Sequence, residues 1–398
     1  MKPTDPDPIV IVDGARTPMG SFQGDLSGAT APELGATSIK AALKRAGIAA
    51  EDIEDVIMGC VLPAGLKQAP ARQASLGAGI PEAAGCTTIN KMCGSGMKAI
   101  MLAHDQLLAG SNDVMVAGGL ESMSNAPYLL PKVRTGLRMG HGEVQDHMFI
   151  DGLEDAYEPG KLMGHFAEKT ATHYQFTRQA QDDFAITSLQ RAQQAMQSGA
   201  FDTEIEAVTI KTRKGNKTIS ADEQPPKADL ERIPALRPAF DPDGTVTAAN
   251  ASSISDGAAA VVLMRQSEAD RRGLSPRARI LAHASHAQAP AWFTTAPVYA
   301  MEKLLTKVGW QSNEVDLFEI NEAFACVTMA AMHELGLDHE KVNVYGGACA
   351  LGHPVGASGA RIVVTVMNAL ERHSLTTGVA SLCIGGGEAT AIAIERIN

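Results

Sequence analysis

The sequence lacks several features that would direct the chain to a membrane, an organelle or nucleic acid. No apolar run is long enough to cross a bilayer, and residues 1–8 have no apolar signal core and carry two acidic residues. Residues 395–398 carry no peroxisomal address. The 34 basic side chains are outnumbered by 45 acidic ones, and this excess argues against a broad nucleic-acid interface. We therefore expect a cytoplasmic protein that binds neither membranes nor nucleic acid.

The sequence also lacks the common signatures of metal, disulfide, phosphate and serine-hydrolase sites. The six cysteines form no Cys-x-x-Cys pair and are too sparse for a disulfide framework, so reduced thiols are expected. No Gly-x-Ser-x-Gly elbow, phosphate-binding loop or His-Glu-x-x-His motif is present. Four histidines without metal-ligand spacing are interpreted as surface residues, namely His283, His286, His333 and His339. We expect no metal and no cofactor.

The composition that is present supports a large, layered core. A length of 398 residues predicts two or three domains, and an apolar content of 45% with 38 glycines suits tightly packed helices and sheets. An anionic ligand would need a local basic patch in so acidic a chain. The basic residues of 211–217, or Arg232 with Arg237, could form one. The same charges equally fit a solvated hairpin.

Two parts of the chain repeat one order of elements. After Cys93, apolar residues at helical spacing lead to an apolar strand at 114–117 and a glycine pair. Much later, a helical pattern at 362–370 leads to a strand at 379–383 and another glycine pair. This order indicates a duplicated βαβ-type unit, with parallel sheets sandwiched by helices.

The remaining stretches suggest simple local elements around these repeats. A buried strand is expected at 9–12, and a helix at 32–46 that Gly47 ends. Residues 123–251 differ in character, because they hold much of the charge, a proline-rich stretch and a long helix at 178–198 capped by Thr177. We interpret this region as an inserted loop domain that covers the active face.

Three glycine-rich segments contain Cys93, His353 and Cys383. Glycine has no side chain to cover its neighbours, so we expect both thiols to be exposed. Cys93 directly precedes a predicted helix, whose free N–H groups and dipole are expected to lower the thiol pKa. Cys383 ends an apolar strand at a glycine turn, where active sites of parallel sheets commonly lie. A small buried hydrophobe remains an equal interpretation of Cys93.

His353 precedes Pro354 and is therefore kept out of a regular helix, where it could serve as a base for a nearby thiol. Two thiols and one base are redundant for hydrolysis, but they suit a reaction in which one thiol carries an acyl group and the other moves a proton. Asn321 follows an apolar-acidic stretch and could orient a water or a carbonyl. An Asx-turn or a helix cap explains Asn321 equally well.

Taken together, these segments resemble the thiolase family, and within it the acetyl-CoA acetyltransferases. The likeness covers essentially the whole length and includes the Cys93, His353 and Cys383 loops with residues 12–18, 118–123, 237–240, 245–252 and 321–324. It implies an α/β fold of two similar α-β-α-β-α layered domains with an inserted loop domain. The implied boundaries are 1–122 plus 253–276 for the N-terminal core, 123–252 for the loop domain and 277–398 for the C-terminal core. The loop domain would bind coenzyme A, and residues 128–147 resemble a tetramerisation loop, so a homotetramer is implied.

The resemblance also implies a ping-pong Claisen condensation of two acetyl-CoA to acetoacetyl-CoA and CoA, with thiolysis as its reverse. Cys93 would carry the acetyl group, and His353 would activate Cys93 and then donate to the second thioester oxygen. Asn321 would hold a water beside His353, and Cys383 would remove or return the α-proton. The backbone N–H groups of Cys93 and Gly385 would bind the oxygen of the acyl-enzyme.

Binding of coenzyme A is implied for a further set of residues, some of which depart from the family pattern. Ser252 would contact the pantetheine arm, with Met163, Phe240 and Phe324 along its tunnel. Leu162 and Phe293 stand where histidine and methionine are common, and Arg232 falls where adenine-side contacts are expected. These departures leave two alternatives open: a degradative 3-ketoacyl-CoA thiolase of broader chain length, and a non-catalytic acyl-CoA-binding relative. A β-ketoacyl synthase is disfavoured by the thiol at Cys383.

Overall fold

The computed structural model describes residues 7–213 and 215–397. Its strands are β1 (Ile9–Arg16), β2 (Gly20–Ser21), β3 (Asp55–Gly59), β4 (Gly85–Ile89), β5 (Val114–Ser122), β6 (Tyr128–Leu129), β7 (Gln145–Asp146), β8 (Val208–Thr212), β9 (Gly215–Ile219), β10 (Ser255–Arg265), β11 (Ala278–Ala287), β12 (Leu317–Ile320), β13 (Thr377–Ile384) and β14 (Glu388–Arg396). Its α-helices are α1 (Ala31–Ala46), α2 (Pro70–Gly77), α3 (Ser95–Leu108), α4 (Met163–His173), α5 (Arg178–Gln197), α6 (Gln266–Arg272), α7 (Ala296–Val308), α8 (Ala325–Leu335), α9 (Ala348–Leu351) and α10 (Ser358–Arg372).

One continuous mixed sheet runs through the described part of the molecule, in the order β12-β13-β14-β11-β1-β10-β5-β3-β4, with β2 paired to β10. Its two halves join where β1 and β11 pair antiparallel over Val10 and Ile11. Among the paired strands described, β3 lies parallel to β4 and to β5, and β12 lies parallel to β13, whereas the other pairs are antiparallel. The expectation of separate parallel sheets was therefore wrong. The strands β10 and β14 run antiparallel to their neighbours. An apolar run that ends in glycine has the same sequence pattern in a parallel and in an antiparallel strand, so the sequence does not predict the strand direction.

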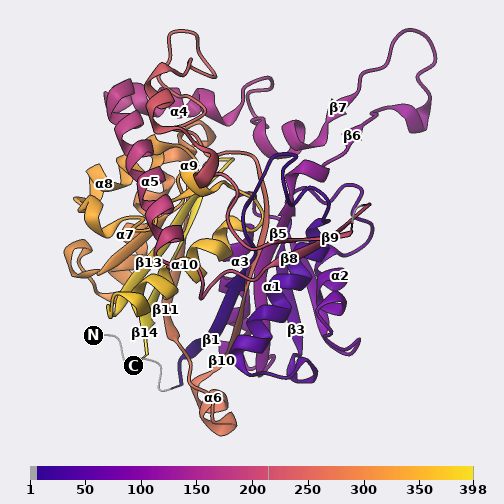
Figure 1. Cartoon of the computed structure of the whole chain (residues 1–398), viewed down its shortest axis with the longest axis vertical. Coiled ribbons are helices and arrows are strands. Elements are labelled where there is room, and N and C mark those ends of the chain that lie inside the picture. Colours follow the sequence, from indigo (N-terminus) through magenta and orange to yellow (C-terminus); the bar gives the residue numbers. More distant parts are fainter. Residues whose placement is uncertain (1–6, 214, 398) are drawn as a thin grey trace.

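Three apolar clusters lie between five layers (Figure 1). In order, the layers are outer helices, one half of the sheet, the central helices, the other half of the sheet, and outer helices. Successive residues of β1 alternate between clusters: Ile9 and Ile11 face the central helices α3 and α10, whereas Val10 and Val12 face α1 and α2. On the other half, α7 and α8 cover the outer face of β11 to β14. Burial on both faces explains why these strands read as continuous apolar runs.

The predicted repeat is present in the connectivity. Helix α3 leads into β5 and helix α10 leads into β13, and each of these strands lies parallel to a neighbour, β3 or β12. Glycines let the two central helices approach closely, because a Cβ on Gly96 would lie 2.8 Å from the backbone nitrogen of Ala360. The N-termini of α3 and α10 therefore meet, and the loops before them, which contain Cys93 and His353, are brought together.

The expected local elements around the repeat are also confirmed. α1 ends at Gly47, whose φ of 65° is the left-handed conformation that glycine adopts freely. α5 begins after Thr177, whose side chain accepts a hydrogen bond from the backbone N–H of Ala180. The sequence reasoning missed α4, which begins at Met163 and has no side-chain cap.

The region between Met123 and Ser252 contains α4, α5 and two small hairpins. The β6–β7 hairpin and the chain that joins its strands project from the molecule as an arm at the upper right of Figure 1. The β8–β9 hairpin carries Lys211 and Lys217 with exposed side chains, and Lys217 pairs with Asp25 at 2.7 Å. The solvated-hairpin interpretation is thus confirmed for Lys211 and Lys217, whereas Lys214 lies outside the described residues. The domain boundaries themselves remain predictions.

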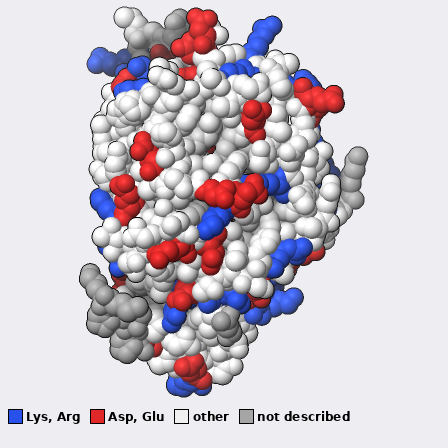
Figure 2. All heavy atoms as spheres, turned by 90° about the vertical axis from the view of Figure 1, so that its left-hand side faces the viewer, with Lys and Arg blue, Asp and Glu red and all other residues white. Residues whose placement is uncertain are grey.

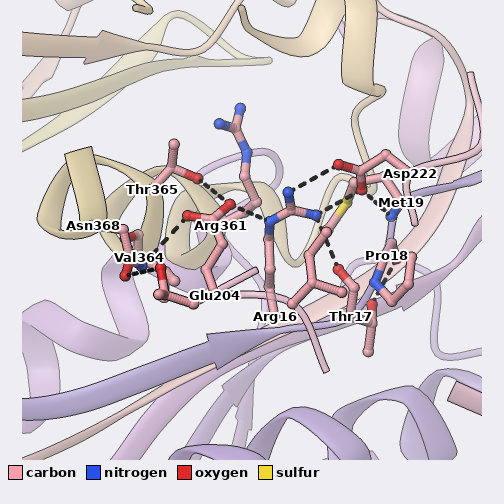
Figure 3. A network of polar contacts seen from close by, with 12 residues as sticks. Arg16, Thr17, Pro18, Met19, Glu204, Asp222, Arg361, Val364, Thr365 and Asn368 are labelled. Atoms are coloured by element: carbon pink, nitrogen blue, oxygen red, sulfur yellow. Dashed lines mark hydrogen bonds and ion pairs between the residues drawn. The ribbon is translucent and has the colours of Figure 1, made fainter. Parts of the chain in front are cut away.

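A buried ion network attaches this inserted region to the core (Figure 3). The Arg16 guanidinium at the end of β1 donates to Glu204 at 2.6 Å and to both carboxylate oxygens of Asp222 at 2.6 and 2.9 Å. All three side chains are fully buried, and Arg16 also lies over the ring of Phe201. Loss of one carboxylate would leave a buried charge unpaired, at a cost of about 3–5 kcal/mol.

The surface charges are mixed rather than sorted by sign on the face shown. Figure 2 shows basic and acidic side chains interspersed on the side of the molecule that forms the left of Figure 1. Mixed signs cancel over short distances, so this face produces no extended field of one sign. Among the described residues, no helix is both long and apolar enough to cross a membrane.

Candidate active site

Four loops from both halves of the sheet converge at one end of α3 and α10. The backbone N–H of Asn321 donates to Ser381 at 3.0 Å, which places the loop after β12 beside the strand that carries Cys383. The N–H of His353 donates to Ser253 at 3.0 Å, and the N–H of Ser252 donates to Ala323 at 2.9 Å. These backbone bonds fix the loops to one another without using the functional side chains.

The two sulfur atoms lie close enough for a charge on Cys93 to affect the pKa of Cys383. A Cβ on Gly94 would lie 2.4 Å from the side chain of Ile384, so the loop after Cys93 packs directly against the end of β13. Burial raises the pKa of Cys93 and the backbone of Gly385 lowers it, which places Gly385 beside the Cys93 thiol. The charge of a Cys93 thiolate in turn raises the pKa of Cys383. The structure thus places the Cys93 loop beside the end of the strand that carries Cys383, and the roles assigned to these groups remain predictions.

Burial, however, corrects two sequence-based expectations about these thiols. Burial raises the pKa of Cys93 to about 11, and the hydrogen bonds from the N–H groups of Gly385 and Cys93 offset only part of this effect. Cys93 is half-buried, and Cys383 is fully buried rather than exposed. Burial also raises the pKa of Cys383 well above its usual value. The expected lowering of the Cys93 pKa was therefore wrong, because burial of the thiol has the larger effect.

His353 is buried as a neutral imidazole with one ring nitrogen free. Burial, and then the charge of Arg361, lowers the pKa of His353 to about 3. Its Nδ1 lies 2.5 Å from the Ser358 hydroxyl, which itself donates to the Pro354 carbonyl at 3.1 Å. The hydroxyl proton is thus in use, so Ser358 accepts from Nδ1–H and Nε2 carries the lone pair. Nε2 is buried without a partner among the described residues, as a general base requires.

Replacement of Ser358 by alanine should slow acetyl transfer by about 10–100-fold, the usual cost of losing a group that orients a functional imidazole. The alanine removes the acceptor for Nδ1–H, so the imidazole can hold its proton on Nε2 and lose its function as a base. Stopped-flow release of CoA from acetyl-CoA measures this step. Threonine should restore most of the rate because it keeps the hydroxyl, and an unchanged rate in the alanine variant would exclude the role of Ser358.

Asn321 also presents unpaired polar atoms. Its side chain is 1% exposed, yet neither Oδ1 nor Nδ2 has a partner among the described residues. An Asx-turn or helix cap would use Oδ1, so both of those interpretations are wrong. Buried amides without partners are costly, and such groups are retained where a ligand or water binds. The predicted role of Asn321 in holding a water remains a prediction.

The apolar wall around Cys383 contains most of the residues predicted to bind the substrate. Phe293 and Phe324 are buried in the same cluster as Cys383, and Met163 and Phe240 pack against this cluster. The rings of Phe240 and Phe324 meet edge to face at 6.1 Å. Met163 also reaches Gly385, where an added Cβ would lie 3.4 Å from its sulfur.

The other predicted contacts lie further from the thiols. Leu162 and Ser252 are partly buried at the start of α4 and beside the Asn321 loop. Arg232 is exposed and lines a cavity of about 320 Å³ together with Lys227 and Ala249. Two cations at one cavity suit a phosphate-bearing ligand, although the structure does not test their contact with coenzyme A.

Two buried carboxylates that hold the loops were missed by sequence reasoning. Glu121 accepts the N–H groups of Val61, Leu62 and Gly356 at 2.9, 3.1 and 2.9 Å, which fastens the His353 loop to the end of β5. Burial raises the pKa of Glu121 to about 7. Glu121 and the second carboxylate, Glu322, both lie in segments that resemble the thiolase family, and this resemblance is the sequence signal that could have identified them.

The second carboxylate, Glu322, directly follows Asn321. It accepts from Ser188 at 2.7 Å, from Asn343 at 2.8 Å and from the N–H of Cys349 at 3.1 Å. Glu322 therefore joins the Asn321 loop to α5 and to the segment that leads to His353.

Comparisons with known proteins agree with this geometry. A family model described as "Thiolase, N-terminal domain" matches residues 9–267, and one described as "Thiolase, C-terminal domain" matches residues 274–396. The chain belongs to the thiolase family. This thiolase is 50% identical to an acetyl-CoA acetyltransferase of Escherichia coli over 98% of the chain and 99% of that protein. It is 48% identical to one of Mus musculus named cytosolic, over 98% of each chain.

Solved thiolase structures show the same fold. A Bacillus anthracis acetyl-CoA acetyltransferase superposes with a TM-score of 0.96 at 41% identity, over 98% of this chain and 99% of the other. The Acat5 thiolase from Ascaris suum, solved in complex with coenzyme A, gives 0.93 at 43% identity, over 98% and 100%. The layered, duplicated thiolase fold expected from the sequence is confirmed.

Proposed function

We propose that this thiolase is an acetyl-CoA C-acetyltransferase, which condenses two acetyl-CoA to acetoacetyl-CoA and CoA and catalyses the reverse thiolysis. The observation that carries the proposal is the packing of the Cys93 loop directly against the end of the strand that carries Cys383, where a Cβ on Gly94 would lie 2.4 Å from the side chain of Ile384. The names of its relatives support the same substrates. The reaction proceeds through acetyl-Cys93 and draws on no cofactor beyond the CoA thioesters.

In the first half-reaction, the Cys93 sulfur attacks the thioester carbonyl of acetyl-CoA. The Cys93 proton passes to Nε2 of His353 and then to the departing CoA sulfur, so the charge balance is kept. The carbonyl oxygen becomes an oxyanion, which the N–H groups of Cys93 and Gly385 stabilise. Donors of this kind contribute about 3–4 kcal/mol each to the transition state.

The reaction starts from the form in which the two sulfurs hold one proton between them, on Cys93, so Cys383 is a thiolate once Cys93 is acetylated. In the second half-reaction, this thiolate removes an α-proton from a second acetyl-CoA. The resulting carbanion attacks acetyl-Cys93, and Cys93 leaves as a thiolate that takes the proton back from Cys383. The enolate oxygen is stabilised by His353 and by a water on Asn321. In thiolysis the order reverses, and Cys383 gives its proton to the departing enolate. Burial, and then the charge of a Cys93 thiolate, raises the pKa of Cys383, so the shared proton lies on Cys383 when Cys93 is a thiolate, which is the form that thiolysis needs.

The acyl group is short in this proposal because aromatic side chains surround Cys383. Phe293 is 2% exposed and shares an apolar cluster with Cys383, and Phe166 packs on it edge to face at 6.5 Å. Extra methylenes would have to displace these rings from a packed cluster. A degradative thiolase of broad chain length would need space that these rings fill.

Chain-length preference is tested by thiolysis of 3-ketoacyl-CoA substrates of increasing length. We expect CoA-dependent loss of the acetoacetyl-CoA enolate absorbance, and kcat/KM lower by at least about tenfold for the 3-ketooctanoyl substrate, since overpacking a core costs about 1–3 kcal/mol. Equal rates for both substrates would favour the broad-specificity alternative. No turnover with any substrate would favour the acyl-CoA-binding alternative.

We also propose self-association through the β6–β7 arm, as a homotetramer, in the cytoplasm. The arm exposes large apolar side chains that a monomer would leave in water, namely Tyr128, Leu130, Val133, Leu137, Met139 and Val144. Met139 is 96% exposed. Light scattering should give the mass of four chains, and deletion of the arm should reduce it. The cytosolic name of the mouse relative supports the location.

A further inference from the structure

A second cluster of chemically active side chains lies at the other end of α3 from Cys93. His104 and Asp105 stand in the last turns of α3, and His283 reaches them from β11. Asp105 Oδ1 lies 3.3 Å from Nδ1 of His104 and 2.8 Å from Nε2 of His283. The two imidazole rings meet edge to face at 5.1 Å. His283 therefore belongs to a cluster, which corrects its interpretation as a plain surface residue.

We propose that His104, Asp105 and His283 form a binding site for a divalent transition-metal ion of the Zn²⁺ type. One oxygen and two nitrogens, all within 4.8 Å of one another, are ligands that zinc accepts from proteins. Ligand atoms on a tetrahedral zinc are about 3.3 Å apart, given bond lengths of about 2.0–2.1 Å. The two measured oxygen–nitrogen distances lie on either side of this value, so small side-chain shifts suffice.

The charges and exposure of the cluster suit a cation. Both imidazoles direct a ring nitrogen at the same carboxylate oxygen of Asp105. A dication bound there would replace the hydrogen bonds to this oxygen, with each imidazole bound through a ring nitrogen that carries no proton and its proton held on the other ring nitrogen. The Asp105 side chain is 51% exposed, which leaves an entry path and room for a water as fourth ligand.

The position of the site suggests what the metal does. α3 belongs to the first repeat of the fold and β11 to the second, so a shared ion would fasten the two halves at the end opposite the thiols. The cluster lies about 16 Å from Cys93, at 1.5 Å of rise for each of eleven residues. Metal binding should therefore stabilise the fold without changing catalysis. Lys307 donates to the carbonyl of His283. Its positive charge lowers the affinity of the site for a cation, so we expect weaker binding than at a zinc site with four protein ligands.

Equilibrium dialysis against Zn²⁺ tests the proposal, with matched variants to exclude zinc on the free thiols. We expect the wild-type protein to bind one more zinc per chain than His283→Ala or Asp105→Asn. Each variant should lose at least about tenfold in affinity at this site, since even groups outside the coordination sphere cost about 10–100-fold. His286→Ala is the control, because His286 lies on the same strand but bonds to Gln288 and Lys303 instead.

Two further readouts make the outcome decisive. Saturating Zn²⁺ should raise the thermal midpoint of the wild type and of His286→Ala but not that of the two site variants. Turnover of acetoacetyl-CoA should be equal in all four proteins, which shows that they are folded. Equal zinc binding by the wild type and Asp105→Asn, or an equal loss in His286→Ala, would overturn the proposal. If His283→Ala does not fold, Asp105→Asn decides.

Discussion

Replacement of Cys93 by serine is expected to abolish the transfer of acetyl from acetyl-CoA to the protein. Turnover should fall by about 10⁴-fold or more, since removal of an enzyme's nucleophile costs up to about 10⁶ in kcat. A serine hydroxyl keeps the shape but is a far weaker nucleophile than a thiol at neutral pH. Intact-protein mass spectrometry after mixing with acetyl-CoA measures the acetyl group directly.

Cys86→Ser is the matched control for this experiment. Cys86 is also half-buried and lies on β4, where its sulfur accepts from Arg72 at 3.8 Å, away from the converging loops. This variant should gain one acetyl group as the wild type does. Full acetylation of the Cys93 variant would mean that another side chain carries the acetyl group, and the first half-reaction as described would be wrong.

The Cys383→Ser variant is expected to separate the two halves of the reaction. Acetylation of Cys93 should continue within a few-fold of the wild-type rate, whereas condensation and exchange of the acetyl-CoA α-protons should fall by about 10²–10⁴-fold, the usual contribution of a general acid or base. A serine hydroxyl is much less acidic than a thiol and cannot act as the base. Deuterium exchange into acetyl-CoA, followed by NMR, reports the proton transfer alone.

Cys326→Ala provides the control for burial and packing. Cys326 shares the apolar cluster of Cys383 and is fully buried, but its thiol contacts the Ala167 carbonyl at 3.6 Å. We expect it to retain proton exchange. If exchange stays normal in Cys383→Ser, then Cys383 has no part in proton transfer, and the base must be sought elsewhere in the site.

The pKa values of the site predict how Cys93 reacts with pH in the free enzyme. His353 has a pKa of about 3 and Cys93 of about 11, so the pair is an imidazole with a thiol at neutral pH rather than an ion pair. The thiolate fraction then rises about tenfold for each pH unit below the thiol pKa. Alkylation of Cys93 by iodoacetamide should follow this slope from about pH 6 to about pH 10. A plateau near neutral pH would instead indicate a stabilised thiolate.

Much of the fold could be predicted from the sequence because its signals are local. Apolar periodicity located α1 and β1, and Gly47 and Thr177 marked helix ends through their own backbone or side chain. Strand direction could not be predicted, since it depends on which strands pair across the sheet. The short helix α4 was missed because it has no side-chain cap and is too short for a clear apolar periodicity.

The site was predicted in its members but not in its electrostatics. The glycine settings and the family resemblance located both thiols and the imidazole, and the structure brings the thiols together. The pKa of Cys93 was expected to fall because the sequence shows the helix but not the burial around the thiol. The role of Ser358 and the His104–Asp105–His283 cluster depend on contacts in space. Asp105 and His283 are 178 positions apart in the sequence, so no local pattern connects them.

A crystal structure of the acetylated enzyme tests the convergence of these groups most directly. The account predicts an acetyl group on the Cys93 sulfur, with its carbonyl oxygen within hydrogen-bonding distance of the N–H groups of Cys93 and Gly385. The Cys383 sulfur should face the space beside this acetyl group, where the second acetyl-CoA presents its methyl. An acetyl group on Cys383 or Cys349, or an oxygen directed away from Gly385, would contradict the account.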